Sequence, residues 1–288
     1  MKIVLSPNPY RDKGLKAAMA ARDILQASGV ETVLCLPFSH DGDHAPELPG
    51  DLELHEMNSV LPGADALICF GGDGTILHAA KKAETWDIPI LGVNMGSVGF
   101  MAELEHSEMQ LLQKIAEGAY SIERRMMLDV QVVRGGKILL RDTALNDAVI
   151  TKGAVARVID LLVSGDGVLI TRFSGDGVIV STPTGSTAYS MSAGGPIVEP
   201  TAENLIITPI CAHSLQTKSL VLGRDRAVGI RISRHSRKSA YLSVDGGRAF
   251  RLFAGDTVNV TRSEHQTRLI RLTNRSFYEI VNQKLGKV

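Results

Sequence analysis

The five residues Gly71-Gly72-Asp73-Gly74-Thr75 combine three glycines with a carboxylate and a hydroxyl group. Glycine lets backbone N–H groups approach a phosphate closely, and a helix N-terminus favours an anion. Because a carboxylate repels phosphate, Asp73 indicates a general base for an attacking hydroxyl or a partner for magnesium. The pattern predicts phosphoryl transfer, with Gly71, Gly72, Gly74 and Thr75 as the phosphate-donor loop; a simple turn is the alternative.

A second stretch gathers hydroxyl groups and glycines around an expected helix start. It runs from Gly175-Asp176-Gly177 through a short strand to Ala193-Gly194-Gly195-Pro196, and seven of the ten residues 181–190 carry a hydroxyl group. A sugar or an adenine edge requires such groups, whereas a single helix cap uses one hydroxyl. The stretch therefore favours nucleotide binding over a capped glycine-rich loop.

A third signal is the pair Asn146-Asp147. An Asn side chain can read an amide or adenine edge with two hydrogen bonds, and an adjacent carboxylate can accept from ribose hydroxyls. By itself, an Asn-Asp pair is most often a turn. His78 and His213 receive no role, because a lone His is more often a packed or surface residue.

Two widespread phosphate motifs are missing from the sequence. No Gly-x4-Gly-Lys-Ser/Thr occurs, which excludes a P-loop enzyme. No Gly-x-Gly-x-x-Gly opens a helix after the first expected strand, so the ordinary Rossmann fingerprint is absent too. Any dinucleotide must be held in another way.

The elements that position these groups alternate between strand and helix up to about residue 120. We expect strands at 2–5, 30–36, 66–70 and 88–93, and helices at 14–27, 75–83 and 107–116. This alternation predicts a parallel sheet with helices on both faces. The loop 71–75 then follows a buried strand at the carboxyl edge of the sheet, where ligands bind in open α/β folds.

The pattern changes after residue 120. Apolar runs on either side of Gly135-Gly136, and again around Gly165-Asp166, predict two hairpins. Further strands are expected at 178–181, 240–244 and 257–261, with one short helix near 186–193. The fold class is therefore an α/β N-terminal domain with a parallel sheet plus a β-rich, antiparallel C-terminal domain.

Composition limits the possible partners. The chain has 288 residues, and its 31 basic and 31 acidic residues cancel, which argues against a nucleic-acid partner. The only short basic run, Arg234–Lys238, is interpreted as a solvated turn. No stretch approaches the roughly 18 apolar residues of a membrane span, and the apolar run at the N-terminus is shorter than we expect of a signal peptide. We expect a cytoplasmic protein with no membrane partner.

The cysteines point to the same compartment. Cys35, Cys69 and Cys211 are odd in number, lie far apart and form no Cys-x-x-Cys pair. This pattern predicts buried thiols in a reducing compartment, with neither a disulfide framework nor a zinc site.

Taken together, four segments resemble the ATP-dependent NAD kinase family of bacterial type, over most of the chain. They are Gly71–Thr75, Val93–Phe100, Asn146-Asp147 and Asp176–Pro196. The last segment is the most specific, because Gly71–Thr75 is shared with lipid kinases and is close to what phosphofructokinases carry.

The resemblance implies a two-domain fold with the active site between the domains. Residues 1–119, joined by a C-terminal return at 268–288, would form the phosphate-donor domain, and 120–267 the NAD-binding and oligomerisation domain. Asp73 would be the general base that activates the 2′-hydroxyl of the adenosine ribose of NAD. The loop around it would hold ATP, the donor, with Mg²⁺ or another divalent metal, and no metal-ligating residues are assigned.

The resemblance also implies a set of NAD-binding residues and a homo-oligomer, a dimer or a tetramer, in which Tyr189 and Ser192 lie near a neighbour's ligand. Asp176 would lie near the nicotinamide half, and Asp245 in a loop that lines the pocket. The family most often has Glu where this chain has Asp147, which is one methylene shorter. The implied NAD-binding residues are Asn146, Asp147, Asp176, Thr184, Thr187, Ala188, Tyr189, Ser192 and Asp245.

Three alternatives stay open at the level of sequence. A lipid kinase could use the same Gly71–Thr75 loop, but it would need a membrane-facing basic or apolar surface, for which the balanced charge offers little support. A sugar kinase would need cations for a second phosphate, and only Lys81-Lys82 is close in sequence. A non-catalytic dinucleotide-binding regulator is the third, and the intact Asp73 argues against it.

Overall fold

The computed structural model describes residues 1–38, 48–50, 52–96, 99–153, 157–214, 217–233 and 239–286. The chain divides into two compact units. Unit 1 comprises Met1–Arg124 together with Thr267–Val288, and unit 2 comprises Arg125–Gln266. These junctions lie close to the boundaries expected from the sequence, near residues 120 and 268. The roles of the two units in binding the phosphate donor and NAD stay predictions.

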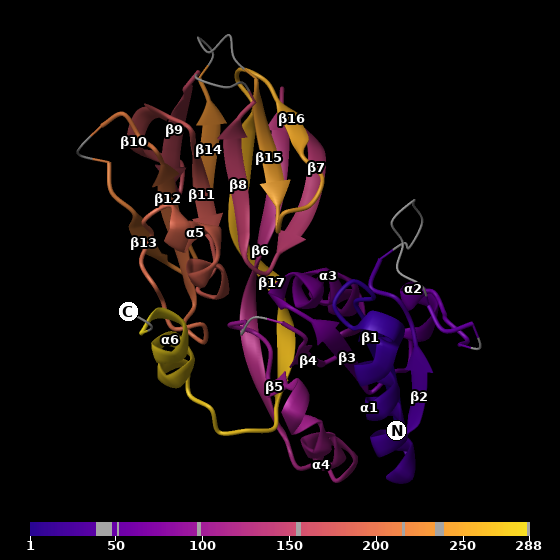
Figure 1. Ribbon diagram of the computed structural model, residues 1–288. Helices are drawn as coiled ribbons and strands as arrows, with labels where there is room; N and C mark the ends of the chain where they lie inside the picture. The colour runs from indigo at the N-terminus through magenta and orange to yellow at the C-terminus, as the bar shows by residue number, and fades with distance from the viewer. Residues whose placement is uncertain are drawn as a thin grey trace. The chain divides into compact units, whose positions relative to one another are not determined.

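Unit 1 is built on a parallel sheet (Figure 1). Its strands lie in the order β2-β1-β3-β4, and both β5 and the end of β17 also pair with β4 in parallel. Every residue of β3 and β4 is buried, and for β3 this confirms the predicted strand covered on both faces. The strands are β1 Lys2–Pro7, β2 Glu31–Leu34, β3 Ala66–Gly71, β4 Ile90–Asn94 and β5 Leu104–Glu105.

The first helix begins later than the sequence predicts. Gly14 and Leu15 have φ of 66° and 53°, so the regular helix α1 starts only at Lys16. The Asp12 carboxylate accepts the N–H groups of Ala17 and Ala18 at 2.9 and 3.0 Å, which satisfies donors of the first turn. The helices of unit 1 are α1 Lys16–Ala27, α2 Met57–Val60, α3 Asp73–Ala83, α4 Gln113–Ala116 and α6 Phe277–Leu285, with 3₁₀ turns η1 Lys13–Leu15, η2 Glu84–Trp86 and η3 His106–Leu112.

Unit 2 contains two antiparallel sheets that share one core. The first has the order β10-β9-β14-β17, with β6 pairing with both β17 and β7, and the second has the order β13-β12-β11-β8-β15-β16. Buried side chains from both sheets, among them Val130, Ile150, Leu161 and Val180, form one cluster. This confirms the predicted antiparallel, β-rich second half.

The second unit's elements have the following bounds. The strands are β6 Ser121–Arg134, β7 Lys137–Ala144, β8 Asp147–Lys152, β9 Ile159–Gly165, β10 Val168–Gly175, β11 Gly177–Ser181, β12 Asn204–Ile210, β13 Leu220–Gly223, β14 Val228–Ile232, β15 Ala240–Val244, β16 Phe250–Leu252 and β17 Thr257–Arg271. The helical turns are η4 Thr184–Thr187 and α5 Tyr189–Ser192.

Both predicted hairpins are confirmed, and their turns show why they form. The two-residue turns are Gly135-Gly136, with φ of 55° and 80°, and Asp166-Gly167, with φ of 51° and 80°. Two successive positive φ values define the type I′ turn, whose twist matches that of the flanking strands.

The predicted burial of the cysteines is confirmed for two of them and wrong for the third. Cys35 and Cys69 are buried as predicted, but Cys211 is exposed, because it lies just after β12 with φ of 45° rather than inside a strand. The basic run Arg234–Lys238 lies outside the described residues.

Within the part of the chain that the structure describes, no helix combines the length and apolar character needed to cross a membrane.

The return of the chain to unit 1 is anchored on one buried carboxylate. Glu103 is only 5% exposed, and its Oε1 accepts the N–H groups of Leu272 and Thr273 at 2.9 and 2.7 Å. Its Oε2 accepts from Arg271 Nη1 at 3.1 Å, and the same guanidinium donates to Glu123 at 2.8 Å. Residues 271–273 are therefore held by charge-assisted hydrogen bonds.

Replacing this carboxylate should destabilise unit 1. We expect Glu103→Ala to lower the free energy of unfolding of unit 1 by about 3–5 kcal/mol, because it breaks the ion pair with Arg271 and leaves two backbone N–H groups without their acceptor. Trp86 is the only tryptophan and belongs to unit 1, so its fluorescence during urea unfolding reports on this unit. The control is Glu117→Ala at an exposed glutamate; equal unfolding midpoints for the two variants would contradict the anchoring role.

Candidate functional site

The predicted phosphate-donor loop joins β3 to α3 in unit 1. β3 ends at Gly71 and α3 begins at Asp73, with Gly72 as an extended N-cap. A Cβ at Gly71 would lie 2.3 Å from Thr75 Oγ1, so the first glycine is required by close packing inside the loop. Thr75 Oγ1 also accepts a hydrogen bond from Asn8 Nδ2 at 3.1 Å. The loop 71–75 is thus a compact strand-to-helix junction.

The Asp73 carboxylate is held by a second loop, the one that follows β4. Its Oδ2 accepts the N–H group of Phe100 at 2.8 Å, and its Oδ1 accepts that of Met101 at 3.2 Å. A Cβ at Gly99 would lie 2.0 Å from Oδ1, so only glycine leaves room for the carboxylate. Each carboxylate oxygen has a second lone pair, which leaves capacity for a proton or a metal ion.

The start of the second loop is fixed as well. Met95 donates its N–H to the Gly71 carbonyl oxygen at 3.0 Å, and Asn94 Nδ2 donates to Glu105 Oε2 at 2.8 Å. The segment Val93–Phe100 is one of the four that resemble the family, and these contacts fix its position. Residues 97 and 98 lie outside the described residues. The orientation of Asp73 by Phe100 and Met101 could not be predicted from the sequence.

In unit 2, the predicted pair Asn146-Asp147 is held by Asp245. The carboxylate of Asp245 accepts the N–H groups of Leu145, Asn146 and Asp147 at 2.7, 2.8 and 2.9 Å. This gives Asp245, which has φ of 48°, a positioning role towards the pair. Its predicted contact with NAD stays a prediction.

The hydroxyl-rich stretch packs directly on the same pair. Thr182 Oγ1 donates to the Leu145 carbonyl oxygen at 2.5 Å and accepts the Gly185 N–H at 3.0 Å. A Cβ at Gly185 would lie 2.1 Å from the Asn146 carbonyl oxygen, so this glycine permits the close approach. The structure therefore brings Asn146, Asp147 and the start of the 184–192 segment together.

Within that segment, Thr184 is buried, whereas the other predicted NAD-binding residues are more accessible. Thr184 Oγ1 accepts a hydrogen bond at 3.1 Å from Nη1 of Arg125, which is itself buried. Thr187 and Ala188 are half-buried, whereas Tyr189 and Ser192 are exposed. Arg125 was not found from the sequence, because nothing in the sequence marks this single arginine as buried.

Asp176 does not lie with Asn146, Asp147 and the 184–192 segment. β11 runs antiparallel to β8, with Ser181 opposite Asp147 and Gly177 opposite Thr151. Asp176 therefore lies at the other end of β11, about 16 Å along the strand from Ser181. There its carboxylate pairs with Lys152 Nζ at 2.6 Å.

Comparison with known proteins decides the family. Models of the ATP-NAD kinase N-terminal and C-terminal domains match residues 13–120 and 145–272. The curated NAD kinase of Natranaerobius thermophilus is 43% identical over 98% of this chain and 96% of its own length. That of Acetivibrio thermocellus is 35% identical over 99% of this chain and 97% of its own. The chain belongs to the ATP-NAD kinase family.

Solved structures agree with this assignment. The yeast NADH kinase complexed with NADH covers 100% of this chain and 88% of its own, with a TM-score of 0.83 at 25% identity. An NAD kinase from Archaeoglobus fulgidus in complex with ATP shares the fold, with a TM-score of 0.74 and complete coverage of both chains at 24% identity. The chain is therefore a kinase of the NAD kinase family, which phosphorylates NAD to NADP, and the lipid and sugar kinase alternatives are set aside.

The Asp147 carboxyl of this NAD kinase has an unusual electrostatic environment. It is 5% exposed, and burial, together with the nearby charge of Asp245, raises the pKa of Asp147 from 3.8 to about 7. Burial disfavours the charged form of a carboxyl, and a second carboxylate adds repulsion. A group at this position with a pKa near neutrality can change between hydrogen-bond donor and acceptor under physiological conditions.

This shift predicts a pH-dependent stability. Because the folded chain binds the Asp147 proton more tightly than the unfolded chain, the stabilisation is complete below about pH 4 and is lost as the pH rises through about 7. The full shift corresponds to at most roughly 4 kcal/mol. We expect Asp147→Asn to become progressively more stable than the wild type between these pH values.

Thermal unfolding by circular dichroism across this pH range measures the effect. The matched control is Asp225→Asn, at an aspartate of unit 2 whose side chain is 71% exposed. Parallel stability curves for the wild type and Asp147→Asn would mean that the carboxyl is ionised throughout, and would contradict the shift.

Proposed function

We propose that this chain transfers the γ-phosphoryl group of ATP to the 2′-hydroxyl of the adenosine ribose of NAD, with Asp73 as the general base. The observation that carries the proposal is the placement of Asp73. Its carboxylate is fixed by two backbone N–H groups at the first residue of α3, next to a glycine-rich loop at the carboxyl end of β3. Phosphoryl transfer depends mainly on such positioning and on charge neutralisation.

In this mechanism the Asp73 carboxylate accepts the proton of the attacking hydroxyl. A general base must lie within about 2.6–3.2 Å of the oxygen from which it takes the proton. The two N–H groups fix where both oxygens point, so the carboxylate does not need to reorient when NAD arrives. The backbone of Gly71, Gly72, Gly74 and Thr75 would hold the donor's phosphates at the N-terminus of α3, where the helix dipole favours anions.

The residues that would hold NAD lie in unit 2. Asn146 Oδ1 is buried and has no hydrogen-bond partner within the described part of the chain, which supports a role as acceptor for a ligand donor such as the adenine amino group. Asp147 would accept from the ribose hydroxyls. Thr184, Thr187, Ala188 and Tyr189 would complete the binding surface, Asp245 would position the Asn146-Asp147 turn, and Asp176 would act towards the nicotinamide half.

A magnesium ion fits the donor site. Magnesium in phosphoryl transferases is usually held by one or two carboxylates together with the substrate phosphates, and it keeps several waters. Asp73 supplies a carboxylate whose oxygens each keep a lone pair beside the phosphate loop. When bound, the ion would neutralise charge on the donor's phosphates.

We further propose a cytoplasmic homo-oligomer, a dimer or a tetramer. Tyr189 is 45% exposed and Ser192 is exposed, although both follow directly on the segment that packs against Asn146. A large exposed aromatic beside a binding segment is well placed to meet the ligand of a neighbouring subunit. The odd, unpaired cysteines support a reducing compartment.

The proposal predicts a specific defect for Asp73→Asn. Since an amide cannot accept the proton, kcat should fall about 10²- to 10⁴-fold while the affinity for NAD stays within about two-fold of the wild type. NADP formation from NAD, ATP and magnesium is read through an NADP-specific dehydrogenase, and NAD binding is measured by calorimetry. Asp23→Asn, at an exposed aspartate of unit 1, is the matched control.

The outcomes separate the alternatives. NADP formation by the wild type and the control, but not by Asp73→Asn, supports Asp73 as the base. Unchanged turnover in Asp73→Asn means that another group takes the proton. NAD binding without NADP formation by the wild type, under any donor tried, favours a regulator that has lost catalysis.

A further inference from the structure

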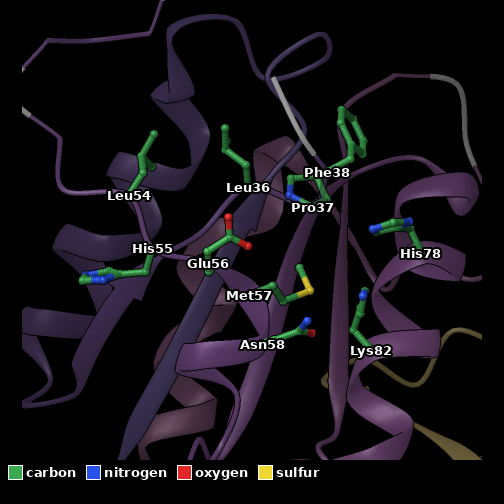
Figure 2. Close-up of a pocket in the computed structure, with 10 residues that line it drawn as sticks. All are labelled: Leu36, Pro37, Phe38, Leu54, His55, Glu56, Met57, Asn58, His78 and Lys82. Carbon is green, nitrogen blue, oxygen red and sulfur yellow. The ribbon is translucent and has the colours of Figure 1, made fainter. Parts of the chain in front are cut away.

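Unit 2 contains a buried cation at its first residue. Arg125, in β6, is 2% exposed, and it is the only buried arginine or lysine among the residues that the structure describes. By comparison, Lys82, which lines a pocket of about 510 Å³ in unit 1, is half-buried (Figure 2). Burying a charge is costly unless the charge is paired and hydrogen-bonded, so Arg125 needs specific partners at its position.

One of these partners is the hydroxyl group of Thr184. Nη1 of Arg125 donates to Thr184 Oγ1 at 3.1 Å, and Thr184 is itself only 5% exposed. A guanidinium carries donors and no acceptor, so the direction of this hydrogen bond is fixed. The oxygen of the Thr184 hydroxyl group is therefore the acceptor, and its proton must point elsewhere.

The neighbouring hydroxyl groups differ from that of Thr184 in this respect. Thr182, Ser186 and Thr187 each donate their proton to a backbone carbonyl oxygen, at 2.5, 2.6 and 3.2 Å. Thr184 donates to no acceptor within the described part of the chain. Of the hydroxyl groups in residues 182–187, all of which are described, that of Thr184 alone keeps its proton for a ligand.

A buried acceptor without a partner lies on the adjoining segment. Thr184 begins η4, and the next residue, Gly185, packs closely on the Asn146 carbonyl oxygen. Asn146 Oδ1 is buried and has no hydrogen-bond partner among the described residues. Since buried polar groups in proteins are hydrogen-bonded, the Thr184 proton and Asn146 Oδ1 both require a ligand. NAD carries both acceptor and donor atoms and can satisfy the two.

We propose that Arg125 is a positioning residue, which makes the Thr184 hydroxyl group an obligatory hydrogen-bond donor towards NAD. The inference rests on the proposed function, in which Thr184 belongs to the NAD-binding surface. The charge of Arg125 polarises the hydroxyl group and so strengthens it as a donor. Its partner on NAD is an acceptor atom, a ring nitrogen, a ribose oxygen or the carboxamide oxygen, and not an N–H group.

Calorimetry with NAD in the absence of ATP tests the inference. Thr184→Val removes the hydroxyl group at nearly constant shape, and Arg125→Met removes the donor but keeps an unbranched apolar side chain. Each should weaken NAD binding roughly ten-fold, which corresponds to the loss of about one hydrogen bond. In turnover, KM for NAD should rise by a similar factor, whereas kcat and KM for ATP stay within about two-fold of the wild type.

Three further variants distinguish positioning from a general structural role. If both residues act on one hydrogen bond, the double variant Arg125→Met with Thr184→Val should bind NAD about ten-fold, rather than about a hundred-fold, more weakly than the wild type. Arg125→Lys, which keeps a charged donor, and Thr184→Ser, which keeps the hydroxyl group, should each stay within about three-fold.

The matched control is Arg124→Met, at the neighbouring arginine of β6, which is exposed. It should bind NAD like the wild type. Should Arg125→Met fold poorly, Thr184→Val and Arg125→Lys decide the matter, because only the first of these should lose affinity for NAD.

Three results would overturn the inference: unchanged NAD affinity in Thr184→Val, losses that multiply in the double variant, or a rise in KM for ATP equal to that for NAD. NADP formation by the wild type, with an unaltered KM for NAD in both single variants, would overturn it but leave the proposed function intact. A wild type that binds NAD through Thr184 yet makes no NADP would sustain the inference and contradict the proposed function.

Discussion

The Asp73 carboxylate accepts one N–H group from Phe100 and one from Met101, so the loops that follow two neighbouring parallel strands hold each other in place. Close packing around this interaction accounts for one glycine in each loop. A methyl group at Gly99 would meet the carboxylate, and one at Gly71 would meet Thr75. The glycines are needed here because side chains and backbone approach closely, a condition that is separate from any contact with phosphate.

Unit 2 uses the same physical device in an antiparallel setting. The Asp245 carboxylate accepts three successive N–H groups around Asn146, and Gly185 leaves room for the Asn146 carbonyl oxygen. In both units a carboxylate fixes a turn through backbone donors, which are strong when the acceptor is ionised. The two carboxylates thereby give the backbone of both turns a defined shape.

The sequence alone predicts which segments carry the chemistry. It predicts less well which residues of those segments contact one another. Strand–helix alternation and the Gly-Gly and Asp-Gly turns predict both halves of the fold, because these signals are local. The hydrogen bonds from Phe100 and Met101 to Asp73 join residues 27 and 28 positions apart, and no local pattern encodes them. The helix α6 was not predicted, because its sequence is polar and the Ser276 capping box that starts it was not recognised.

The anchoring of residues 271–273 on Glu103 also orders events during protein synthesis. Unit 2 is continuous in the chain, whereas unit 1 combines Met1–Arg124 with a segment that begins at Thr267. On the ribosome, the whole of unit 2 emerges before the partner strand and the arginine that complete unit 1. Domains generally fold as they emerge. The buried carboxylate of Glu103 therefore lacks its counter-charge until Arg271 has been synthesised, and unit 1 can complete its fold only after all of unit 2 has left the ribosome.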